Sequence, residues 1–495
     1  MSGGFEQTVN AVMVLAYMFS MIVVGYLAGR ATKPTTEDYY LMSRNVGFIL
    51  MMFTYLATLQ SMVAFLAATA SYMTHGVAYL ILPLSQGMLM TFLSLLLGWR
   101  YREIARENGV ISQGELVYYR YGSRVGQIVV GLAGYLFNLA YIGIQVVGMA
   151  YILWALGVLD YYTAVFLVGG ITLVYVLLGG LRAVVWSDLV QGVLMLLFFL
   201  TVGIFILVPL GGITGALSLA YNFNPDIFKL PGPAKFYTDS VYVSTYVILP
   251  LGIWLSPHLF IRHYFARDRK SLVGIPLGVL LSQAIMWVFI APLLGFVAQA
   301  VLGPVSKWPI PRADLAIPYL LMRYAPWWLV GPILVGAMAA GMSTVDSQML
   351  AEAQLLIRDV IEPIAKRRLT DMETIRYGRV IIAVTSVVAF IIALFPPPLI
   401  IDLMVGIAFA GFAQFFPALV LGILTRRVNK YGMLVGLVVG LGTVVAIQTY
   451  QLVYGIRPVG YYMGVHNGAW GLLPNLVLTF IVSHVTESRH QHPAR

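Results

Sequence analysis

The stretch Gly336-Ala-Met-Ala-Ala-Gly-Met-Ser-Thr-Val-Asp-Ser-Gln-Met-Leu350 places three hydroxyl side chains, a carboxylate and an amide within six positions of a strongly apolar chain. Residues spaced i, i+3, i+4 and i+7 share one face of a helix, and here they are Ala340, Ser343, Thr344 and Ser347. Hydroxyl and carboxylate oxygens are the ligands that a hard cation prefers, and small neighbours let another backbone approach and add carbonyl oxygens. The stretch therefore predicts a sodium site.

The same stretch also fits a helix-packing seam, in which Ser and Thr bond back to the carbonyl four residues earlier. Asp346 favours the ion site, because a carboxylate inside a membrane is costly and usually functional.

Composition indicates that the chain belongs in a membrane. Of its 495 residues, 60% are hydrophobic and 10% are charged, which is typical of a polytopic membrane protein. There is no Cys, which excludes disulfides and thiolate metal sites. No basic segment precedes the first apolar run, so we expect a retained helix and not a cleaved signal. No Pro-rich or Ser-rich linker divides the chain, which predicts one integral domain over residues 1–495.

Apolar runs long enough to cross a membrane predict thirteen transmembrane helices. They lie at about 8–29, 46–74, 76–98, 127–156, 162–178, 184–210, 242–261, 272–302, 328–351, 377–396, 400–425, 431–452 and 468–485.

The basic residues predict the orientation, because short cytoplasmic loops carry an excess of Lys and Arg. With the N-terminus outside and the C-terminus in the cytoplasm, 24 of the 30 Lys and Arg residues fall inside. The six outside are Lys229, Lys235, Lys307, Arg312, Arg323 and Arg457. The net charge of +10 is thus explained by membrane insertion, and the sequence argues against nucleic-acid binding.

Two predicted helices are irregular. The second carries Thr54, Thr58, Gln60 and Ser61 at mid-depth, which fits either an unwound helix or a continuous helix with polar groups facing the bundle. The seventh is interrupted by Pro250, Gly252 and Pro257, which predicts a break. Two irregular helices about 200 residues apart are the expected sign of an inverted-repeat transporter with its site between them.

Five motifs together resemble the sodium:solute symporter family, which includes sodium-coupled sugar, proline, sialic-acid, pantothenate and monocarboxylate carriers. They are Asp38-Tyr-Tyr-Leu-Met-Ser-Arg-Asn-Val-Gly47, Gly179-Gly-Leu-Arg-Ala-Val-Val-Trp-Ser-Asp-Leu-Val-Gln191, Pro257-His-Leu-Phe-Ile-Arg262, Ala339-Ala-Gly-Met-Ser-Thr-Val-Asp-Ser347 and Phe416-Pro-Ala-Leu-Val-Leu-Gly-Ile-Leu-Thr-Arg-Arg-Val-Asn-Lys-Tyr-Gly432. They span nearly the whole chain in the family's order.

The resemblance implies an all-α, LeuT-type core of two inverted five-helix repeats. The repeats would span about 46–210 and 242–425, with peripheral helices at about 8–29, 431–452 and 468–485. The family's main sodium site would comprise the backbone carbonyls of Ala57, Gln60 and Ala340 and the hydroxyls of Ser343 and Thr344.

Some members of the family bind a second sodium lower down, and the matching positions here are Asp188, Ser343, Asp346 and Ser347. Asp346 stands where those members have a hydroxyl residue. The lower position would therefore hold sodium, a proton, or an ion in transit.

Family substrate contacts map to the helix breaks and the helices that face them. The matching residues here are Ser61, Ala64, Phe65, Gln86, Tyr141, Gln145, Trp254 and Gln283. No Arg or Lys is placed at mid-depth among them, so we expect a small neutral, zwitterionic or weakly anionic solute.

The resemblance implies a sodium-coupled symporter that imports a small organic solute, such as an amino acid or a monocarboxylate, by alternating access. The alternatives are a proton-coupled symporter on the same fold, working through Asp346 or Asp188, and a symporter-like membrane sensor. An enzyme is not expected, because no metalloprotease, nucleophile-elbow or phosphate-loop motif is present. The sequence does not identify the solute, the stoichiometry or the oligomeric state.

Overall fold

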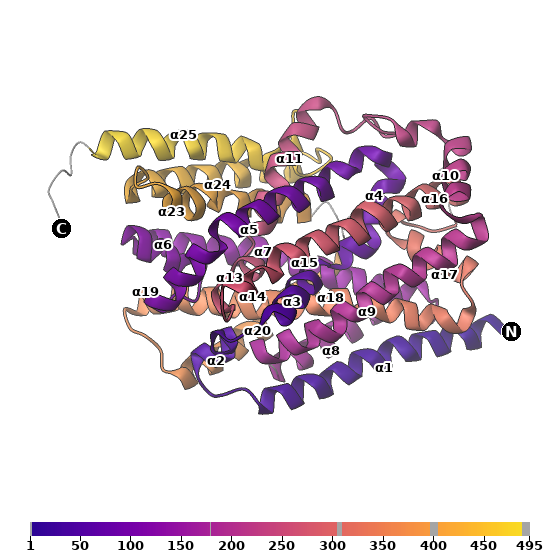
Figure 1. The fold of residues 1–495 in the computed structure, drawn as a ribbon, viewed down its shortest axis with the longest axis horizontal. Coiled ribbons are helices and arrows are strands. Elements are labelled where there is room, and N and C mark those ends of the chain that lie inside the picture. Colours follow the sequence, from indigo (N-terminus) through magenta and orange to yellow (C-terminus); the bar gives the residue numbers. More distant parts are fainter. Residues whose placement is uncertain (1, 179, 304–308, 397–403, 488–495) are drawn as a thin grey trace.

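The computed structural model describes residues 2–178, 180–303, 309–396 and 404–487, and within them the chain is a bundle of helices with one short two-stranded hairpin. The long helices run along the longest axis of the molecule (Figure 1). Helix α1 (Ser2–Arg30) begins at one end, and α25 (Asn467–Glu487) finishes at the opposite end. The first and last helices therefore start and stop on opposite sides, as an odd number of spans requires.

The helices of the first half position the site described below. They are α2 (Thr36–Leu41), α3 (Phe48–Leu59), α4 (Ala68–His75), α5 (Ile81–Asn108), α6 (Gln113–Tyr121), α7 (Arg124–Ala155), α8 (Tyr161–Leu178), α9 (Leu181–Leu207) and α10 (Gly212–Phe223).

The second half continues with a similar set of helices. They are α11 (Asp239–Trp254), α12 (Pro257–Phe260), α13 (Arg262–Phe265), α14 (Arg269–Leu272), α15 (Gly274–Ser282), α16 (Ala291–Leu302), α17 (Ala316–Tyr324), α18 (Trp327–Leu355), α19 (Glu362–Ala365), α20 (Asp371–Leu394), α22 (Ala410–Phe412), α23 (Gly422–Leu424) and α24 (Lys430–Val453). The hairpin is β1 (Tyr461–Tyr462) paired antiparallel with β2 (Val465–His466).

The number of spans differs from the prediction. Among the described residues, ten helical runs are long and apolar enough to cross a membrane, and one bent pair makes an eleventh. The all-α class is confirmed, whereas the count of thirteen is not. The predicted segments 46–74 and 76–98 become the short α3 and a helical run Val63–Asn108, and the start of the segment at 400–425 lies outside the described residues.

Both irregular helices are broken. The first break follows α3 at Gln60, whose backbone is extended (φ −86°, ψ 104°), and a π-helical turn Val63–Ala67 leads on to α4. The second lies between α11 and α12, where the axis bends by 63° in front of Pro257. Pro250 and Gly252 lie within α11, so Pro257 at the start of α12 is the residue that marks this break.

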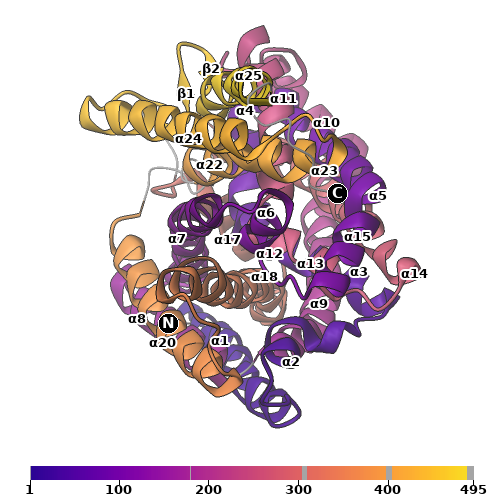
Figure 2. The same ribbon diagram turned by 90° about the vertical axis from the view of Figure 1, so that its left-hand side faces the viewer.

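Helix α18, which carries the opening stretch, lies in the interior. Viewed along the long axis, it is surrounded by α7, α9, α1 and α20 (Figure 2). Every residue from Gly336 to Leu355 is buried. A polar cluster on α18 is therefore shielded from lipid on all sides.

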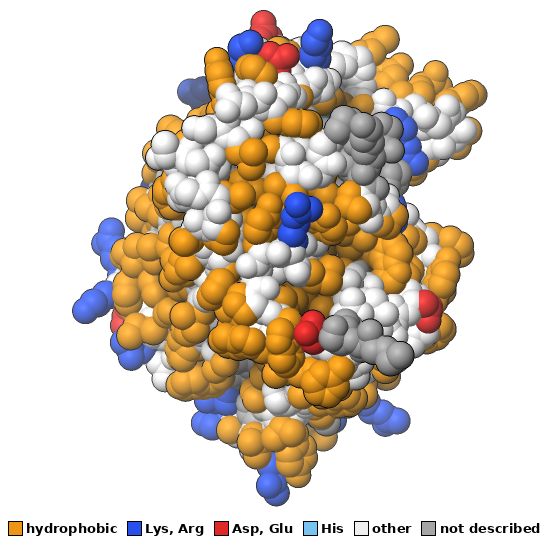
Figure 3. All heavy atoms as spheres, turned by 90° about the vertical axis from the view of Figure 1, so that its right-hand side faces the viewer, with side chains coloured by type: hydrophobic (Ala, Val, Ile, Leu, Met, Phe, Trp, Pro, Cys, Tyr) orange, Lys and Arg blue, Asp and Glu red, His pale blue; other side chains and the backbone are white. Residues whose placement is uncertain are grey.

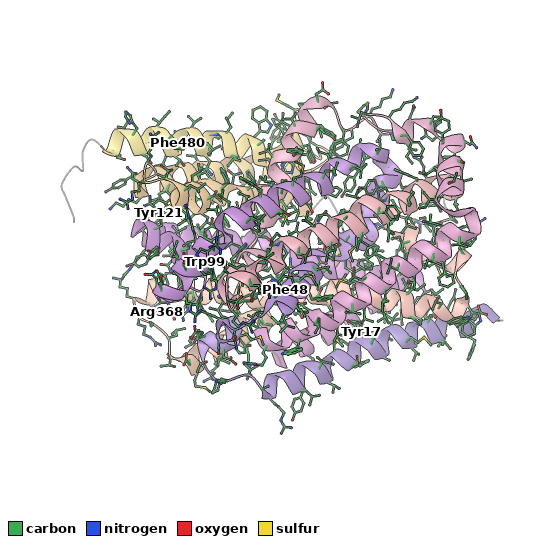
Figure 4. The ribbon with its side chains drawn as sticks, viewed as in Figure 1. Tyr17, Phe48, Trp99, Tyr121, Arg368 and Phe480 are labelled. Atoms are coloured by element: carbon green, nitrogen blue, oxygen red, sulfur yellow. The ribbon has the colours of Figure 1, made fainter. Side chains whose placement is uncertain are left out.

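Apolar side chains cover much of the outer surface. At the end where α1 begins, they dominate the view, with scattered charged groups between them (Figure 3). Exposed large side chains such as Phe5, Phe19, Val23 and Leu27 line α1. The opposite end carries Trp99, Tyr121 and Arg368 (Figure 4). An outer surface covered by apolar side chains suits a lipid bilayer.

Two glycines allow α15 to approach α3 closely. A Cβ on Gly274 would lie 2.7 Å from the Phe48 carbonyl oxygen and 2.9 Å from the Met52 nitrogen, and one on Gly278 would lie 2.7 Å from the Met52 carbonyl oxygen. Small residues four positions apart are the usual means of such backbone contact in membranes. The contact holds the helix whose broken end forms part of the ion site.

We expect Gly274→Ala to lower the free energy of unfolding by about 1–3 kcal/mol, since backbone atoms must move to admit the methyl group. Thermal unfolding of the purified protein would measure the change. Gly170→Ala is the matched control, because no heavy atom lies within 4 Å of a Cβ at Gly170. Equal melting temperatures for the two variants would contradict the close packing of α15 on α3.

Candidate functional site

The break after α3 frees backbone groups in the middle of the bundle. The Met62 N–H donates to the side-chain oxygen of Gln145 at 2.9 Å, in place of the helical carbonyl four residues earlier. The Val63 N–H donates to the Ser61 hydroxyl at 3.2 Å. The carbonyls at the end of α3 therefore lack helical partners, and unwound backbone at this depth is tolerated where it lines a site.

Two hydroxyls of α18 meet those carbonyls. The Ser343 hydroxyl lies 3.0 Å from the carbonyl oxygen of Ala57 and 3.1 Å from that of Ala340. The Thr344 hydroxyl lies 3.3 Å from the carbonyl oxygens of both Thr58 and Gln60 and 3.0 Å from that of Ala340. All six residues are buried, with no solvent exposure for Ser343 and Thr344.

This cluster has more acceptors than donors. Two hydroxyls can donate one proton each, yet they face the carbonyl oxygens of Ala57, Thr58, Gln60 and Ala340. Buried oxygens without enough donors are stabilised by a cation. Oxygens bound about 2.3–2.6 Å from a calcium-sized ion lie roughly 3.3–3.7 Å apart in a regular shell, close to the spacing seen here. These oxygen atoms therefore fit a sodium ion as its ligands.

The side chain of Gln145 holds the break open from α7. We expect Gln145→Leu to leave the Met62 N–H without a partner, which costs about 1–3 kcal/mol. The half-saturating sodium concentration should rise as well, because the carbonyls that follow Leu56 lose their fixed position. Sodium-dependent thermal stabilisation of the purified protein measures both effects.

Gln145→Glu is the matched variant, since it keeps an acceptor oxygen for the Met62 N–H. Wild-type stability and sodium response in Gln145→Leu would show that this hydrogen bond does not maintain the break.

A second polar cluster, called the lower cluster from this point on, lies next to the first one, between α3 and α9. The Thr54 hydroxyl donates to Asp188 Oδ2 at 2.5 Å, and the Thr58 hydroxyl lies 3.5 Å from the same atom. Asp188 is fully buried and sits two turns inside α9, whose N-cap is Gly180, so it does not cap that helix. Its Oδ1 has no hydrogen-bond partner among the described residues.

Arg262, at the start of α13, fills this lower cluster. Its Nη2 donates to the hydroxyls of Ser347 at 2.9 Å, Thr54 at 3.2 Å and Thr58, and it lies 3.4 Å from Asp188 Oδ2. Its Nη1 donates to the carbonyl oxygen of His258. The residue is 1% exposed. In the sequence, Arg262 stands at the end of an apolar run, and nothing there singles it out from the other basic residues.

Asp346 and Ser347 join the lower cluster from α18. The Ser347 hydroxyl lies 3.4 Å from Asp346 Oδ1 and 3.1 Å from the Thr58 hydroxyl. Asp346 also interacts electrostatically with Arg262 and with Tyr17. Tyr17 lies on α1 beside α9 (Figure 4), where Gln191 donates to its hydroxyl at 3.2 Å. Of the four positions predicted for a second cation, Asp188, Asp346 and Ser347 lie around Arg262, whereas the Ser343 hydroxyl contacts the carbonyls of the first cluster.

The residues predicted to contact substrate are all buried, but they form separate groups. Near the first break, Ser61 hydrogen-bonds with Tyr141, while Gln145 contacts Met62 and Ala64 N–H donates to the Ser61 carbonyl. On another side, Gln283 donates to Gln86 at 3.0 Å. These two groups offer amide and hydroxyl contacts around the break.

Phe65 and Trp254 have clear packing roles. The Phe65 ring lies 4.4 Å from that of Phe198 and 4.5 Å from that of Phe199. Trp254 packs on Tyr101 and donates to the Ser94 hydroxyl at 2.9 Å. Neither ring is exposed to solvent in this conformation.

A cavity of about 420 Å³ is lined by residues of α4 and α11, among others. Its lining includes the aromatic groups of His75, Tyr79, Tyr237 and Tyr461, and Arg457. None of the eight residues predicted to contact substrate lines it.

Comparison with known proteins places these features in context. The model described as "SSF: Sodium:solute symporter family" matches residues 39–440. The chain is 26% identical over 469 residues to the sodium/pantothenate symporter of Haemophilus influenzae, covering 94% of each chain. It is 26% identical over 491 residues to the osmoregulated proline transporter OpuE of Bacillus subtilis, covering 97% of this chain and 94% of the relative.

Among solved structures, the fold is similar to the substrate-bound outward-open state of a Na⁺-coupled sialic acid symporter. The TM-score is 0.79 at 19% identity, covering 96% of this chain and 98% of the other. A nucleobase-cation-symport-1 family transporter, Mhp1, in a closed conformation has a TM-score of 0.53 at 14% identity, covering 92% and 96%. The predicted LeuT-type fold class is thereby confirmed.

Proposed function

The chain belongs to the sodium:solute symporter family, and from this premise we propose how its own residues couple sodium to a small organic solute. The protein is a sodium-coupled symporter in a membrane. In our proposal, one sodium ion binds between the end of α3 and the middle of α18. Its ligands are the carbonyl oxygens of Ala57, Gln60 and Ala340 and the hydroxyls of Ser343 and Thr344.

One observation carries this proposal. The hydroxyls of Ser343 and Thr344 lie 3.0–3.3 Å from the carbonyls freed where α3 ends, and these carbonyls outnumber the hydroxyl protons. A packing seam would need only the back-bonds from the two hydroxyls to Ala340. The contacts across to α3 support the ion site over the seam.

Sodium at this position would join two helices that belong to different predicted repeats. Helix α3 lies in the repeat at about 46–210 and α18 in the repeat at about 242–425. A conformation in which the two helices separate loses ligands from one side, so sodium binds the closed arrangement more tightly and shifts the equilibrium towards it. This difference in affinity is what allows a sodium gradient to drive the solute.

We propose that the end carrying the C-termini of α5 and α25 faces the cytoplasm. The support is the distribution of basic residues: 24 of the 30 Lys and Arg residues fall in segments on the same side of the membrane as the C-terminus. The cavity lined by Tyr79 and Tyr237 would then open to the outside and serve as the entry for solute.

For the solute, we propose a small neutral, zwitterionic or weakly anionic molecule such as an amino acid or monocarboxylate. Around the first break, the candidate contacts are the hydroxyls of Ser61 and Tyr141 and the paired amides of Gln86 and Gln283. Groups of this kind orient a small polar solute by hydrogen bonds. The relatives named for pantothenate and proline are consistent with this class.

Uptake into proteoliposomes tests the function. A labelled panel of amino acids, monocarboxylates and sugars would be offered with an inward sodium gradient, with equal sodium on both sides, and with potassium in place of sodium. We expect one class to accumulate above equilibrium only with the sodium gradient.

The same assay distinguishes the alternatives. Accumulation that follows an imposed pH gradient and ignores replacement of sodium by potassium would establish proton coupling instead. Uptake that never exceeds equilibrium would indicate a passive channel. Binding of a solute without transport would favour a sensor.

A further inference from the structure

The guanidinium of Arg262 is surrounded by oxygen atoms, as a bound metal cation would be. Its Nη2 contacts three hydroxyl oxygens, those of Thr54, Thr58 and Ser347, together with Asp188 Oδ2. Hydroxyl and carboxylate oxygens of this kind are also what a sodium ion prefers. Asp188 is 3.4 Å away, so the hydroxyls are closer to Nη2 than the carboxylate is.

The bent helix pair determines where this charge lies. Arg262 begins α13, which follows the 63° bend between α11 and α12, and its Nη1 donates to the His258 carbonyl one turn earlier. Its side chain reaches from there to α3, α9 and α18 at once. Side-chain exposure is 2% for Arg262 and 0% for Asp188, so water does not screen the pair.

The charges around the two clusters balance with a single sodium ion. Asp188 and Asp346 are the carboxylates that interact with Arg262. With both carboxylates ionised, their two negative charges, the guanidinium and one sodium ion at Ser343 and Thr344 sum to zero. Buried charge in a membrane is tolerated when it is paired, so this sum favours binding of one ion and no more.

We propose that Arg262 is a tethered cation that occupies the lower position between Asp188 and Ser347, so that the protein binds and couples one sodium ion. This inference rests on the proposed function, because it assumes a sodium ion at the upper position. In this proposal Arg262 is a positioning residue that determines how many sodium ions the protein binds. Without Arg262, the two carboxylates exceed the bound sodium by one charge, and the vacated oxygens of Thr54, Thr58, Asp188 and Ser347 become available to a second sodium ion.

Binding of radioactive sodium to the purified full-length protein, with no solute added, tests the proposal. We expect one ion per wild-type protein and two per Arg262→Met protein, with cooperative saturation in the variant. Arg262→Lys keeps a positive charge and should still bind one ion.

Charge balance gives a second and independent test. Asp188→Asn leaves an excess positive charge beside the upper position, which should raise the half-saturating sodium concentration about tenfold. Arg262→Met combined with Asp188→Asn removes one charge of each sign, so it should bind one ion with nearly the wild-type affinity. This pair of variants is informative even if Arg262→Met alone does not fold.

Two sodium ions bound to the wild type, or one ion bound to a folded Arg262→Met protein, would overturn the proposal. So would equal loss of affinity in Asp188→Asn and in the double variant. Failure of the proposed function would look different, because the wild type would then bind no sodium.

Discussion

Removal of either hydroxyl ligand, in Ser343→Ala or Thr344→Ala, is expected to raise the half-saturating sodium concentration about 10- to 100-fold. Interactions of a neutral polar group with a charge contribute about 1.5–3 kcal/mol, and each 1.4 kcal/mol corresponds to a factor of ten. The larger effect is expected for Thr344, because its hydroxyl lies within 3.3 Å of three carbonyl oxygens and that of Ser343 near two. Radioactive sodium binding to the purified variants measures the change.

Two variants serve as controls for this prediction. Thr344→Ser keeps the hydroxyl and should keep most of the sodium affinity. Ser386→Ala removes a buried hydroxyl that bonds back to the Ile382 carbonyl on α20, and it should leave sodium binding unchanged. If both Ser343→Ala and Thr344→Ala bind sodium as the wild type does, the ion is not held between α3 and α18.

The largest expected loss of stability comes from Asp38→Asn. The Asp38 side chain is 0% exposed and accepts hydrogen bonds from the Ser43 hydroxyl and Arg182, both at 2.7 Å, and from the Lys33 N–H at 2.8 Å. It thereby ties the loop after α1 to the first turn of α9. Removing one partner of a buried ion pair costs about 3–5 kcal/mol, and the partial exposure of Arg182 places the expected loss near the lower figure.

Unfolding of the purified variant by heat measures the loss. Asp226→Asn is the matched control, since the pair of Asp226 with Lys229 is exposed on both sides and should contribute about 0–1 kcal/mol. A melting temperature for Asp38→Asn equal to that of Asp226→Asn would show that the loop is held by other contacts.

Acid pH should reproduce part of this effect in the wild type. Burial by itself raises the pKa of Asp38, but the hydrogen bonds from Ser43, Lys33 and Arg182 outweigh it and hold the pKa below its usual range. A carboxyl whose folded pKa is lowered contributes stability above its unfolded pKa of about 3.9. That contribution is lost as the pH falls through the folded pKa, and Asp38→Asn should lack this part of the acid sensitivity.

The break in α3 illustrates the limits of sequence pattern. No Gly or Pro interrupts residues 48–74, so the polar residues Thr54, Thr58, Gln60 and Ser61 fit a broken and a continuous helix equally well. What maintains the break is Gln145 on α7 and the hydroxyls of Ser343 and Thr344 on α18, more than 80 residues away in sequence. Propensity within the segment carries no information about such partners.

The role of Arg262 is hidden in the sequence for a related reason. It ends an apolar run and looks like one of many basic residues at a cytoplasmic boundary. The bend in front of Pro257 turns its side chain inwards. There the Ser347 hydroxyl accepts a hydrogen bond from the guanidinium, and the Asp188 carboxylate lies next to its positive charge. An Arg that directly follows a Pro-marked break, opposite a carboxylate in another apolar segment, is the signal that could have identified it.

The sequence by itself determined the membrane class, the helical fold and the residues on one face of α18, because composition and helical spacing are local properties. Only the tertiary structure decided which oxygens surround those residues. The stretch Gly336–Leu350 supplies two hydroxyls and one carbonyl, whereas the remaining carbonyls come from the broken end of α3 and the adjacent charge from α13. A coordination shell is made by groups that meet across helices, and their meeting depends on packing and not on spacing along the chain.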